Sequence, residues 1–192
     1  MSRQIWLIRH GETEWSKDGR HTSRTDLALT EEGERRAAAV GRWLREGGRA
    51  GRPFALVLAS PMRRALDTCR LAGYAGEPTL DLSEWNYGAF EGLTTAQIQV
   101  EHPGWTIWSG TPEGGETAQQ VGARADRVIA RAAGAGGDVA LFGHGHMLRV
   151  LAARWLGLEP EGGRLLELST GSVSVLGYER ETRVLHLWNR TE

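Results

Sequence analysis

The chain has 192 residues, of which 40% are hydrophobic and 24% charged, and its formal net charge at pH 7 is −1. These values fit a single globular domain over residues 1–192 and exclude a disordered or fibrous protein. A nearly neutral chain has no overall attraction for nucleic acid or for an anionic membrane, so we expect neither as a partner. The one cysteine, Cys69, excludes an internal disulfide and favours a reducing compartment.

No targeting or membrane segment is recognisable in the chain. It enters its first apolar stretch almost at once, without a charged leader and a long apolar run, and nothing in it approaches the length of a transmembrane helix. We therefore expect a cytoplasmic location and leave a homodimer open as the assembly.

The first predicted strand, residues 5–9, ends in a basic pair. Its apolar run fits a strand buried on both faces, and it leads directly into Arg9, His10 and Gly11. In open α/β sheets, ligands bind beyond the carboxyl ends of the strands, where a glycine lets backbone N–H groups approach them. We expect Arg9 and His10 to face an anion, and a phosphate fits them best. The alternative is a polar turn with a solvated charge.

A turn-like region is predicted over residues 14–29, followed by a helix. Thr30 is a suitable N-cap, and acidic residues follow it at the positive end of the helix dipole. The apolar stripe carries this helix roughly to residue 46. A second apolar strand is predicted at residues 54–59.

The helix after this second strand is expected to begin with Ser60 as its N-cap and Pro61 at its first position, and to end at Gly73. Arg63 and Arg64 both project away from its apolar stripe. Helical spacing does not decide which of the two turns into a pocket, and either one taken alone also fits a solvated charge.

Residues 81–92 interleave three carboxylates with three aromatic side chains and are predicted to form a loop. Such a loop suits an acid held against aromatic rings, where loss of solvent would raise its pKa. Helices are predicted near residues 94–101 and from residue 116 to about residue 132, with a tryptophan-rich loop between them. Four rings in these segments either wall a sugar or line the core: Trp85, Tyr87, Trp105 and Trp108.

A third buried strand, at residues 138–142, repeats the pattern of the first. It stops at Gly143, His144 and Gly145, and a helix that is apolar on nearly all sides begins at once. Two strands that each end in His-Gly at a helix entrance are the most informative feature of the sequence. The remaining chain is predicted to close the edge of the sheet with strands at residues 165–169, 172–178 and 184–188.

Two histidines and two arginines around one point suggest phosphoryl transfer through a phosphohistidine. A neutral imidazole is a competent nucleophile near pH 7, and arginine forks fit the oxygens of a transferring phosphoryl group. A second histidine, when protonated, adds a donor, and a carboxylic acid delivers the proton that the leaving alkoxide needs. These steps need no metal and no cofactor, so we expect neither.

Residues 7–13, Leu-Ile-Arg-His-Gly-Glu-Thr, resemble the signature of the histidine phosphatase superfamily, and five segments match its motifs in order up to about residue 155. The resemblance implies an α/β fold like that of phosphoglycerate mutases, a three-layer α/β/α sandwich with a mostly parallel central sheet. Carried over by position, it implies a set of catalytic residues: His10 as the phosphorylated nucleophile, Arg9 and Arg64 as phosphoryl ligands, Glu84 as the proton donor and His144 as the second histidine.

The same resemblance implies four substrate-binding residues. Thr22 and Ser23 stand where the family usually has Thr-Gly in a loop near the phosphate, and Ser16 stands where members often have asparagine. Serine reaches less far than asparagine, and Ser23 constrains the loop backbone more than glycine does. Gly145, next to the second histidine, completes the set.

The mutases of this superfamily differ from the chain in two ways. They carry a long insertion between the acid and the following Gly-Glu-Ser/Thr segment, with arginines that bind the carboxylate of phosphoglycerate. Here residues 115–117, Gly-Glu-Thr, follow Glu84 closely, and no arginine lies between them. Without the insertion we expect a more open site, in which water reaches the phosphoenzyme and takes the phosphoryl group. The motifs also resemble a subgroup with fungal sedoheptulose bisphosphatase and actinobacterial acid phosphatases, so we predict a phosphatase for sugar phosphates or other small phosphomonoesters.

Three alternatives stay open. The chain could be a cofactor-dependent phosphoglycerate mutase, or a phospholigand-binding module that has lost catalysis, although a pure binder has no need of the acid Glu84. A metal site at His144 and His146 is the third, and the neighbouring arginines disfavour it. His146 either contacts substrate or is a polar residue at a helix start.

Overall fold

The computed structural model describes residues 3–49 and 52–191, so the ends of the expected domain at residues 1–2 and 192, and positions 50–51, lie outside the described residues. A six-stranded sheet with the order β3-β2-β4-β1-β5-β6 forms its centre. The strands are β1 (Ile5–Arg9), β2 (Leu56–Ala59), β3 (Glu77–Pro78), β4 (Val139–Gly143), β5 (Val173–Glu179) and β6 (Thr182–Arg190).

The pairing of β1 with β4 brings distant parts of the chain to one edge of the sheet. The strands β3, β2, β4 and β1 run parallel, while β5 pairs with β1 and β6 with β5 in antiparallel fashion. Arg9 lies opposite Gly143 in the β1–β4 register. The residues that follow these strands, His10 and His144, therefore emerge side by side. The mostly parallel sheet predicted from the sequence is confirmed.

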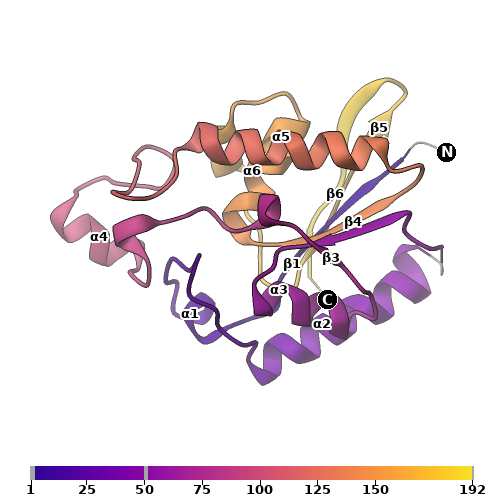
Figure 1. Ribbon diagram of the computed structural model, residues 1–192, viewed down its shortest axis with the longest axis horizontal. Coiled ribbons are helices and arrows are strands. Elements are labelled where there is room, and N and C mark those ends of the chain that lie inside the picture. The colour runs from indigo at the N-terminus through magenta and orange to yellow at the C-terminus, as the bar shows by residue number, and fades with distance from the viewer. Residues whose placement is uncertain (1–2, 50–51, 192) are drawn as a thin grey trace.

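Helices cover both faces of the sheet (Figure 1). The helices α2 (Glu31–Trp43) and α3 (Arg63–Leu71) lie on one face, and α5 (Ala118–Gly134) and α6 (Gly145–Trp155) lie on the other. Each pair packs over its own group of buried apolar side chains from the sheet. The strands β1 and β4 are covered on both sides, which is why their sequences are continuous apolar runs. The three-layer α/β/α architecture is confirmed.

Smaller elements gather beyond the carboxyl edge of the sheet. Helices α1 (Glu14–Lys17) and α4 (Thr95–Glu101) lie at that end of the molecule in Figure 1. Short 3-10 turns occupy η2 (Leu80–Leu82), η3 (Gly88–Phe90) and η4 (Pro160–Leu165). Within the described ranges, the structure has no helix with the length and apolar character needed to cross a membrane.

The expected start of α3 is wrong. The helix begins at Arg63 with Met62 in the N-cap position, so Ser60 and Pro61 precede it. A carboxylate from the preceding loop takes over the capping role, because Asp26 Oδ1 accepts a hydrogen bond of 2.8 Å from the Arg63 N–H. The Ser60 hydroxyl accepts a hydrogen bond of 3.4 Å from the Met62 N–H and has a second, closer partner that is described below.

Three further expectations need correction. Residues 14–21 are not only turns, since Thr13 and Ser16 form a capping box that starts α1. Helix α2 ends at Trp43 and continues as a wider helical turn, η1 (Leu44–Gly48). Residues 165–169 form no strand, because their backbone pairs with side chains: the Leu168 carbonyl accepts from Arg9 Nη1, and Asn189 Oδ1 accepts from the Ser169 N–H at 2.7 Å.

The turn after β1 is held by close backbone contact with the first turn of α2. A Cβ added at Gly11 would come closer than 3.0 Å to the backbone of Gly33, and a Cβ at Gly33 would come equally close to the backbone of Glu12. The Glu12 carbonyl also accepts a hydrogen bond of 2.9 Å from the Thr30 N–H. These contacts fix the turn that carries His10.

We expect Gly33→Ala to lower the free energy of unfolding by about 1–3 kcal/mol, because the new methyl group forces the turn and the helix apart. Denaturation in urea measures this change. The matched control is Gly134→Ala at the end of α5, where an added Cβ meets nothing within 4 Å and the helix gains propensity. Equal stability of Gly33→Ala and the wild type would contradict the prediction.

Candidate active site

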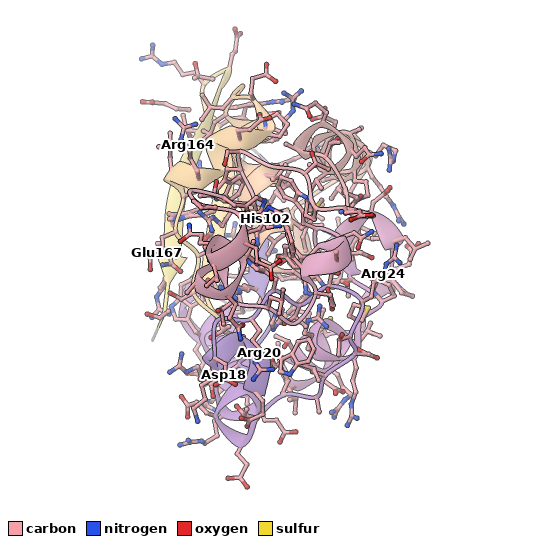
Figure 2. All side chains as sticks on the ribbon, turned by 90° about the vertical axis from the view of Figure 1, so that its left-hand side faces the viewer. Asp18, Arg20, Arg24, His102, Arg164 and Glu167 are labelled. Atoms are coloured by element: carbon pink, nitrogen blue, oxygen red, sulfur yellow. The ribbon has the colours of Figure 1, made fainter. Side chains whose placement is uncertain are left out.

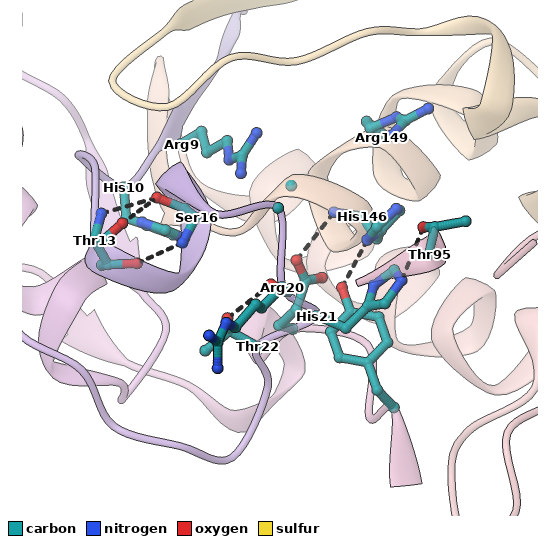
Figure 3. Close-up of a pocket in the computed structure, with 14 residues that line it drawn as sticks. Arg9, His10, Thr13, Ser16, Arg20, His21, Thr22, Thr95, His146 and Arg149 are labelled. Atoms are coloured by element: carbon teal, nitrogen blue, oxygen red, sulfur yellow. Dashed lines mark hydrogen bonds between the residues drawn. The ribbon is translucent and has the colours of Figure 1, made fainter. Parts of the chain in front are cut away.

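A cleft of about 250 Å³ opens at the carboxyl edge of β1 and β4. Figure 2 views this end of the molecule, with Arg20 below His102 and next to Asp18. Six of the nine residues predicted for the site line the cleft, and Ser23, Arg64 and His144 are buried beside it. Figure 3 shows the lining side chains: Arg9, His10, Thr13, Ser16, Gly19, Arg20, His21, Thr22, Glu84, Tyr87, Thr95, Gly145, His146 and Arg149.

His10 has one ring nitrogen occupied and the other free. Its Nδ1 lies 2.7 Å from the Gly11 carbonyl oxygen, which can only accept a hydrogen bond, so the proton sits on Nδ1. The lone pair is then on Nε2, and no described residue hydrogen-bonds to that atom. Burial, followed by the charges of Arg9 and Arg64, lowers the pKa of His10 well below its ordinary value of 6.5. The ring therefore stays neutral and nucleophilic at mildly acidic pH.

His144 lies next to His10, with ring centroids 5.1 Å apart and ring planes at 62°. Its Nδ1 accepts a hydrogen bond of 3.2 Å from Arg64 Nε, so the proton of the neutral ring is on Nε2. That nitrogen lies 2.7 Å from the Ser60 hydroxyl oxygen and donates to it. Ser60 is thus the partner of His144, and its hydroxyl oxygen also accepts a longer hydrogen bond of 3.4 Å from the N–H of Met62, the N-cap residue of α3.

Arg64 is fully buried, unlike its exposed neighbour Arg63. Besides His144, its donors reach three carbonyls of the loop after α1, those of Thr22, Ser23 and Thr25, at 2.9–3.2 Å. The tertiary structure therefore selects Arg64 for the site, as the motif implied. Arg64 holds the loop against the histidine pair, and a direct contact with a phosphoryl group stays a prediction.

The same loop is held from its other side by Glu91. The Glu91 carboxylate accepts from the backbone N–H groups of Ser23 and Thr25 and from the Ser23 hydroxyl, at 2.6–3.0 Å. Ser23 is consequently a loop anchor in this structure. The Thr22 hydroxyl, which lines the cleft, donates to the Arg20 carbonyl at 3.0 Å.

Of the two arginines predicted to bind the phosphoryl group, Arg9 has fewer of its donors paired. Its Nη1 donates to the Leu168 carbonyl, whereas its Nε is buried and has no hydrogen-bond partner among the described residues. A Cβ at Gly145 would lie only 3.2 Å from the Arg9 guanidinium carbon, so a glycine there lets the start of α6 and Arg9 come together. Ser16 also lines the cleft, but its hydroxyl donates to the Thr13 carbonyl at 2.9 Å.

Glu84 lines the cleft, and its carboxylate lies at the N-terminus of α6. Its Oε1 accepts from the N–H groups of Trp85 and Met147, at 2.8 and 2.9 Å, and its Oε2 accepts from the N–H of His146 at 3.1 Å. The loop behind it is held by Arg124, which donates to the Ser83 carbonyl and forms an ion pair with Glu116 at 2.8 Å. Arg124 is a supporting residue that sequence reasoning missed.

The far end of the cleft contains two histidines and a tyrosine that pack together. The His21 ring lies 4.7 Å from the Tyr87 ring and 6.0 Å from the His146 ring. Burial raises the pKa of Tyr87 well above 10, so its phenol stays protonated, and its oxygen is hydrogen-bonded to His146 Nδ1 at 2.6 Å. His21 Nε2 lies 3.2 Å from the Thr95 hydroxyl. Sequence reasoning missed His21, Thr95 and Arg149, because no motif or helical face marks them.

The structure distinguishes the aromatic residues that line the cleft from those that belong to the core. Tyr87 lines the cleft, whereas Trp85 and Trp105 belong to the buried core and Trp108 packs against it. His146 lines the cleft and has Tyr87 as its partner, while His144 is bonded to Arg64 and Ser60. No trio of His, Cys, Asp or Glu in the described parts of the chain is arranged to hold a metal ion.

Stability should fall as the pH drops from about 6.5 to 4, because His21 is buried. Burial lowers the pKa of His21 from 6.5 to about 4. Between these values the unfolded chain binds a proton that the folded chain does not, so acid favours unfolding. The difference corresponds to about 3 kcal/mol at most.

We expect His21→Gln to lose less stability than the wild type between pH 7 and pH 4.5, as measured by urea denaturation at both values. The exposed His186→Gln in β6 is the matched substitution. A wild-type pH dependence in His21→Gln would show that this ring is not the source of the effect.

Comparison with known proteins places the chain in a family. The model of the histidine phosphatase superfamily (branch 1) matches residues 5–191. The chain is 39% identical over 187 residues to an acid phosphatase of Mycobacterium tuberculosis, which covers 96% of this chain and 91% of that protein. It is 36% identical over 182 residues to a sedoheptulose 1,7-bisphosphatase of Saccharomyces cerevisiae, with 79% and 67% covered.

Mutases and solved structures are also similar to the chain. A 2,3-bisphosphoglycerate-dependent phosphoglycerate mutase of Gloeobacter violaceus is 30% identical over 179 residues, with 84% of this chain and 80% of the relative covered. A solved structure of a Mycobacterium tuberculosis protein is 38% identical and superposes with a TM-score of 0.93 over 98% of both chains. With the family model matched from β1 to the end of β6 and the fold shared, the chain belongs to branch 1 of the histidine phosphatase superfamily.

Proposed function

We propose that the chain is a metal-independent phosphatase that hydrolyses small phosphomonoesters, in particular sugar phosphates, through a phosphohistidine on His10. Its family and its acid phosphatase relative already make it a phosphoric monoester hydrolase. The nucleophile, the route and the substrate class are the proposal. One observation carries it: His10, with its unprotonated Nε2, and Arg9, with a donor that no described residue occupies, line the same cleft.

In the first step, His10 Nε2 attacks the phosphorus atom and the bond to the leaving oxygen breaks. Arg9 lines the cleft beside His10 and can neutralise the charge spread over the phosphoryl oxygens, while His144 packs against the His10 ring and keeps its Nε2 proton on the Ser60 hydroxyl. The leaving alkoxide takes a proton from Glu84. Oε2 is the better placed oxygen to hold that proton, because it accepts one backbone N–H where Oε1 accepts two.

In the second step, water attacks the phosphorus atom of phosphohistidine, and the N–P bond breaks. Glu84, now ionised, takes the proton of the attacking water, which returns both side chains to their starting states. Inorganic phosphate then leaves the cleft. No atom outside the chain, the ester and one water molecule is required.

A mutase is the second candidate, and the 30% identity to a phosphoglycerate mutase favours it. The geometry next to the acid supports hydrolysis instead. Trp85 Nε1 donates to the Glu116 carbonyl at 2.8 Å, and the Glu116 N–H donates to the Asn86 carbonyl at 3.0 Å. These bonds join the acid loop directly to the start of α5. The chain therefore has no long insertion at this place, unlike the mutases, in which such an insertion covers the site. A coupled assay with phosphoglycerate and bisphosphoglycerate distinguishes the two, since a mutase interconverts phosphoglycerates faster than it hydrolyses them.

We expect His10→Ala to reduce phosphate release from an aryl phosphate at mildly acidic pH by about a thousandfold or more, because the nucleophile is gone. Mass spectrometry after acid-free rapid quenching should find a phosphoryl group on His10 in the wild type. The exposed His186→Ala should retain both activity and phosphorylation. Full turnover in His10→Ala would refute the proposed route.

We expect Glu84→Gln to slow hydrolysis of a sugar phosphate about a hundredfold or more and hydrolysis of p-nitrophenyl phosphate much less. An alkoxide needs a proton to leave, whereas nitrophenolate is stable without one. Single-turnover rates of phosphoenzyme formation on the two substrates measure the contrast. If both substrates slow by the same factor, Glu84 is not the proton donor.

A further inference from the structure

Helix α3 supports both histidines of the site through two residues that lie one helical turn apart. The Arg64 side chain, in the first turn of the helix, donates to His144 Nδ1. Thr68 follows four residues later on the same buried side of α3. Its Oγ1 accepts a hydrogen bond of 3.0 Å from the N–H of Gly11, the residue directly after His10. One helix therefore contacts the second histidine directly and the turn of the nucleophile through Thr68.

The Thr68 hydroxyl is held in one orientation. The residue is fully buried, and its hydroxyl proton is donated to the Arg64 carbonyl at 2.7 Å. A hydroxyl group has one proton and two lone pairs, so Thr68 presents a lone pair to Gly11. Thr68 is thus a fixed acceptor for the Gly11 N–H.

Both backbone polar groups of Gly11 are engaged next to the nucleophile. Its N–H donates to Thr68, and its carbonyl oxygen lies 2.7 Å from His10 Nδ1. That carbonyl is the group that keeps the ring proton on Nδ1 and leaves the lone pair on Nε2. The tautomer of His10 therefore depends on the direction in which the Gly11 carbonyl points.

Gly11 does not fix this direction by itself. The backbone of Gly33 leaves no room for a Cβ at Gly11, and a residue without a Cβ has a wide range of backbone dihedrals. The preceding residue is restrained, because the His10 N–H donates to the Gly143 carbonyl at 3.0 Å and the His10 carbonyl accepts from the Gly171 N–H at 2.9 Å. A buried N–H without an acceptor is costly, so Gly11 without its acceptor would turn towards another partner and its carbonyl would turn with it.

We propose that Thr68 is a positioning residue for the reaction, which holds Gly11 so that the Gly11 carbonyl keeps His10 in the tautomer with a lone pair on Nε2. Thr68 is not among the residues that line the cleft, so it acts through Gly11 and not on the substrate. The inference rests on the proposed function, since it assumes that His10 attacks phosphorus through Nε2. Its effect is on the rate of phosphoryl transfer to His10 rather than on substrate binding.

The test compares Thr68→Val, which keeps the branched shape and removes the acceptor, with Thr68→Ser, which keeps the hydroxyl. Single-turnover formation of the phosphoenzyme from an aryl phosphate is measured against substrate concentration. We expect Thr68→Val to lower the maximal rate about tenfold or more, because a small displacement of a nucleophile has a large effect on the rate. The half-saturating concentration should stay within about twofold of the wild type, and Thr68→Ser should keep the maximal rate within about threefold.

The tautomer of His10 is a readout that a merely structural role would not move. Long-range ¹H–¹⁵N correlation spectra distinguish protonated from bare nitrogens in a neutral imidazole, and the loss of signals in His10→Gln identifies those of His10. We expect the wild type and Thr68→Ser to carry the proton on Nδ1. In Thr68→Val the two nitrogen shifts should approach each other, as in a ring that exchanges between tautomers.

Ser174→Ala in β5 is the control for the loss of a buried hydroxyl group. The Ser174 hydroxyl accepts a hydrogen bond of 2.9 Å from the Asn189 N–H, and Ser174 is not part of the cleft lining. This variant should keep the wild-type rate and the wild-type signals of His10. Thermal melting shows whether each variant is folded, and the smaller Thr68→Ala takes the place of Thr68→Val if the valine variant is not.

The inference is overturned if the variant without the hydroxyl forms the phosphoenzyme at the wild-type rate, or if its rate falls while the His10 signals keep the wild-type pattern. A Thr68→Ser variant as slow as Thr68→Val overturns it as well. Failure of the proposed function looks different. In that case the wild type carries no phosphoryl group on His10, or His10→Ala releases phosphate as fast as the wild type does.

Discussion

The parallel pairing of β1 with β4 is the constraint on which the site depends. Because Arg9 lies opposite Gly143, the chain leaves both strands at the same level, and His10 and His144 come within 5.1 Å of each other between ring centres. The turn after β1 is then fixed against α2 by glycine backbones in contact, and the turn after β4 becomes the first turn of α6. A shift of one residue in this register would turn one of the two imidazoles away from the cleft.

Electrostatics in the cleft follow from burial without counter-ions. Arginines and histidines share a space of about 250 Å³ whose lining holds one carboxylate. Burial and the neighbouring positive charges lower the pKa values of His10, His144 and His146, so these rings stay neutral. The arginines stay charged, so their uncompensated charge is available to a phosphorylated ligand. A chain with a net charge of −1 thereby presents a local anion site.

Charged side chains next to the cleft hold its loops in place. Arg64 and Glu91 hold one loop from two sides, and Arg124 holds the loop of the acid. In each case a buried or half-buried charge bonds to backbone atoms of an irregular segment, which needs such partners because it has none within a helix or sheet. The same logic applies to residues 165–169, whose carbonyl and N–H groups pair with side chains instead of a strand.

Local pattern in the sequence determined the buried strands, most of the helices and the His-Gly turns, because apolar periodicity and glycine report directly on burial and on backbone approach. The motif around residues 7–13 likewise determined the family and the expected nucleophile. Only the tertiary structure decided that Ser60 bonds to His144, that Asp26 caps α3, and that Arg149 and His21 face the cleft. Those facts depend on which side chains meet across long stretches of chain, and neither helical period nor strand alternation contains that information.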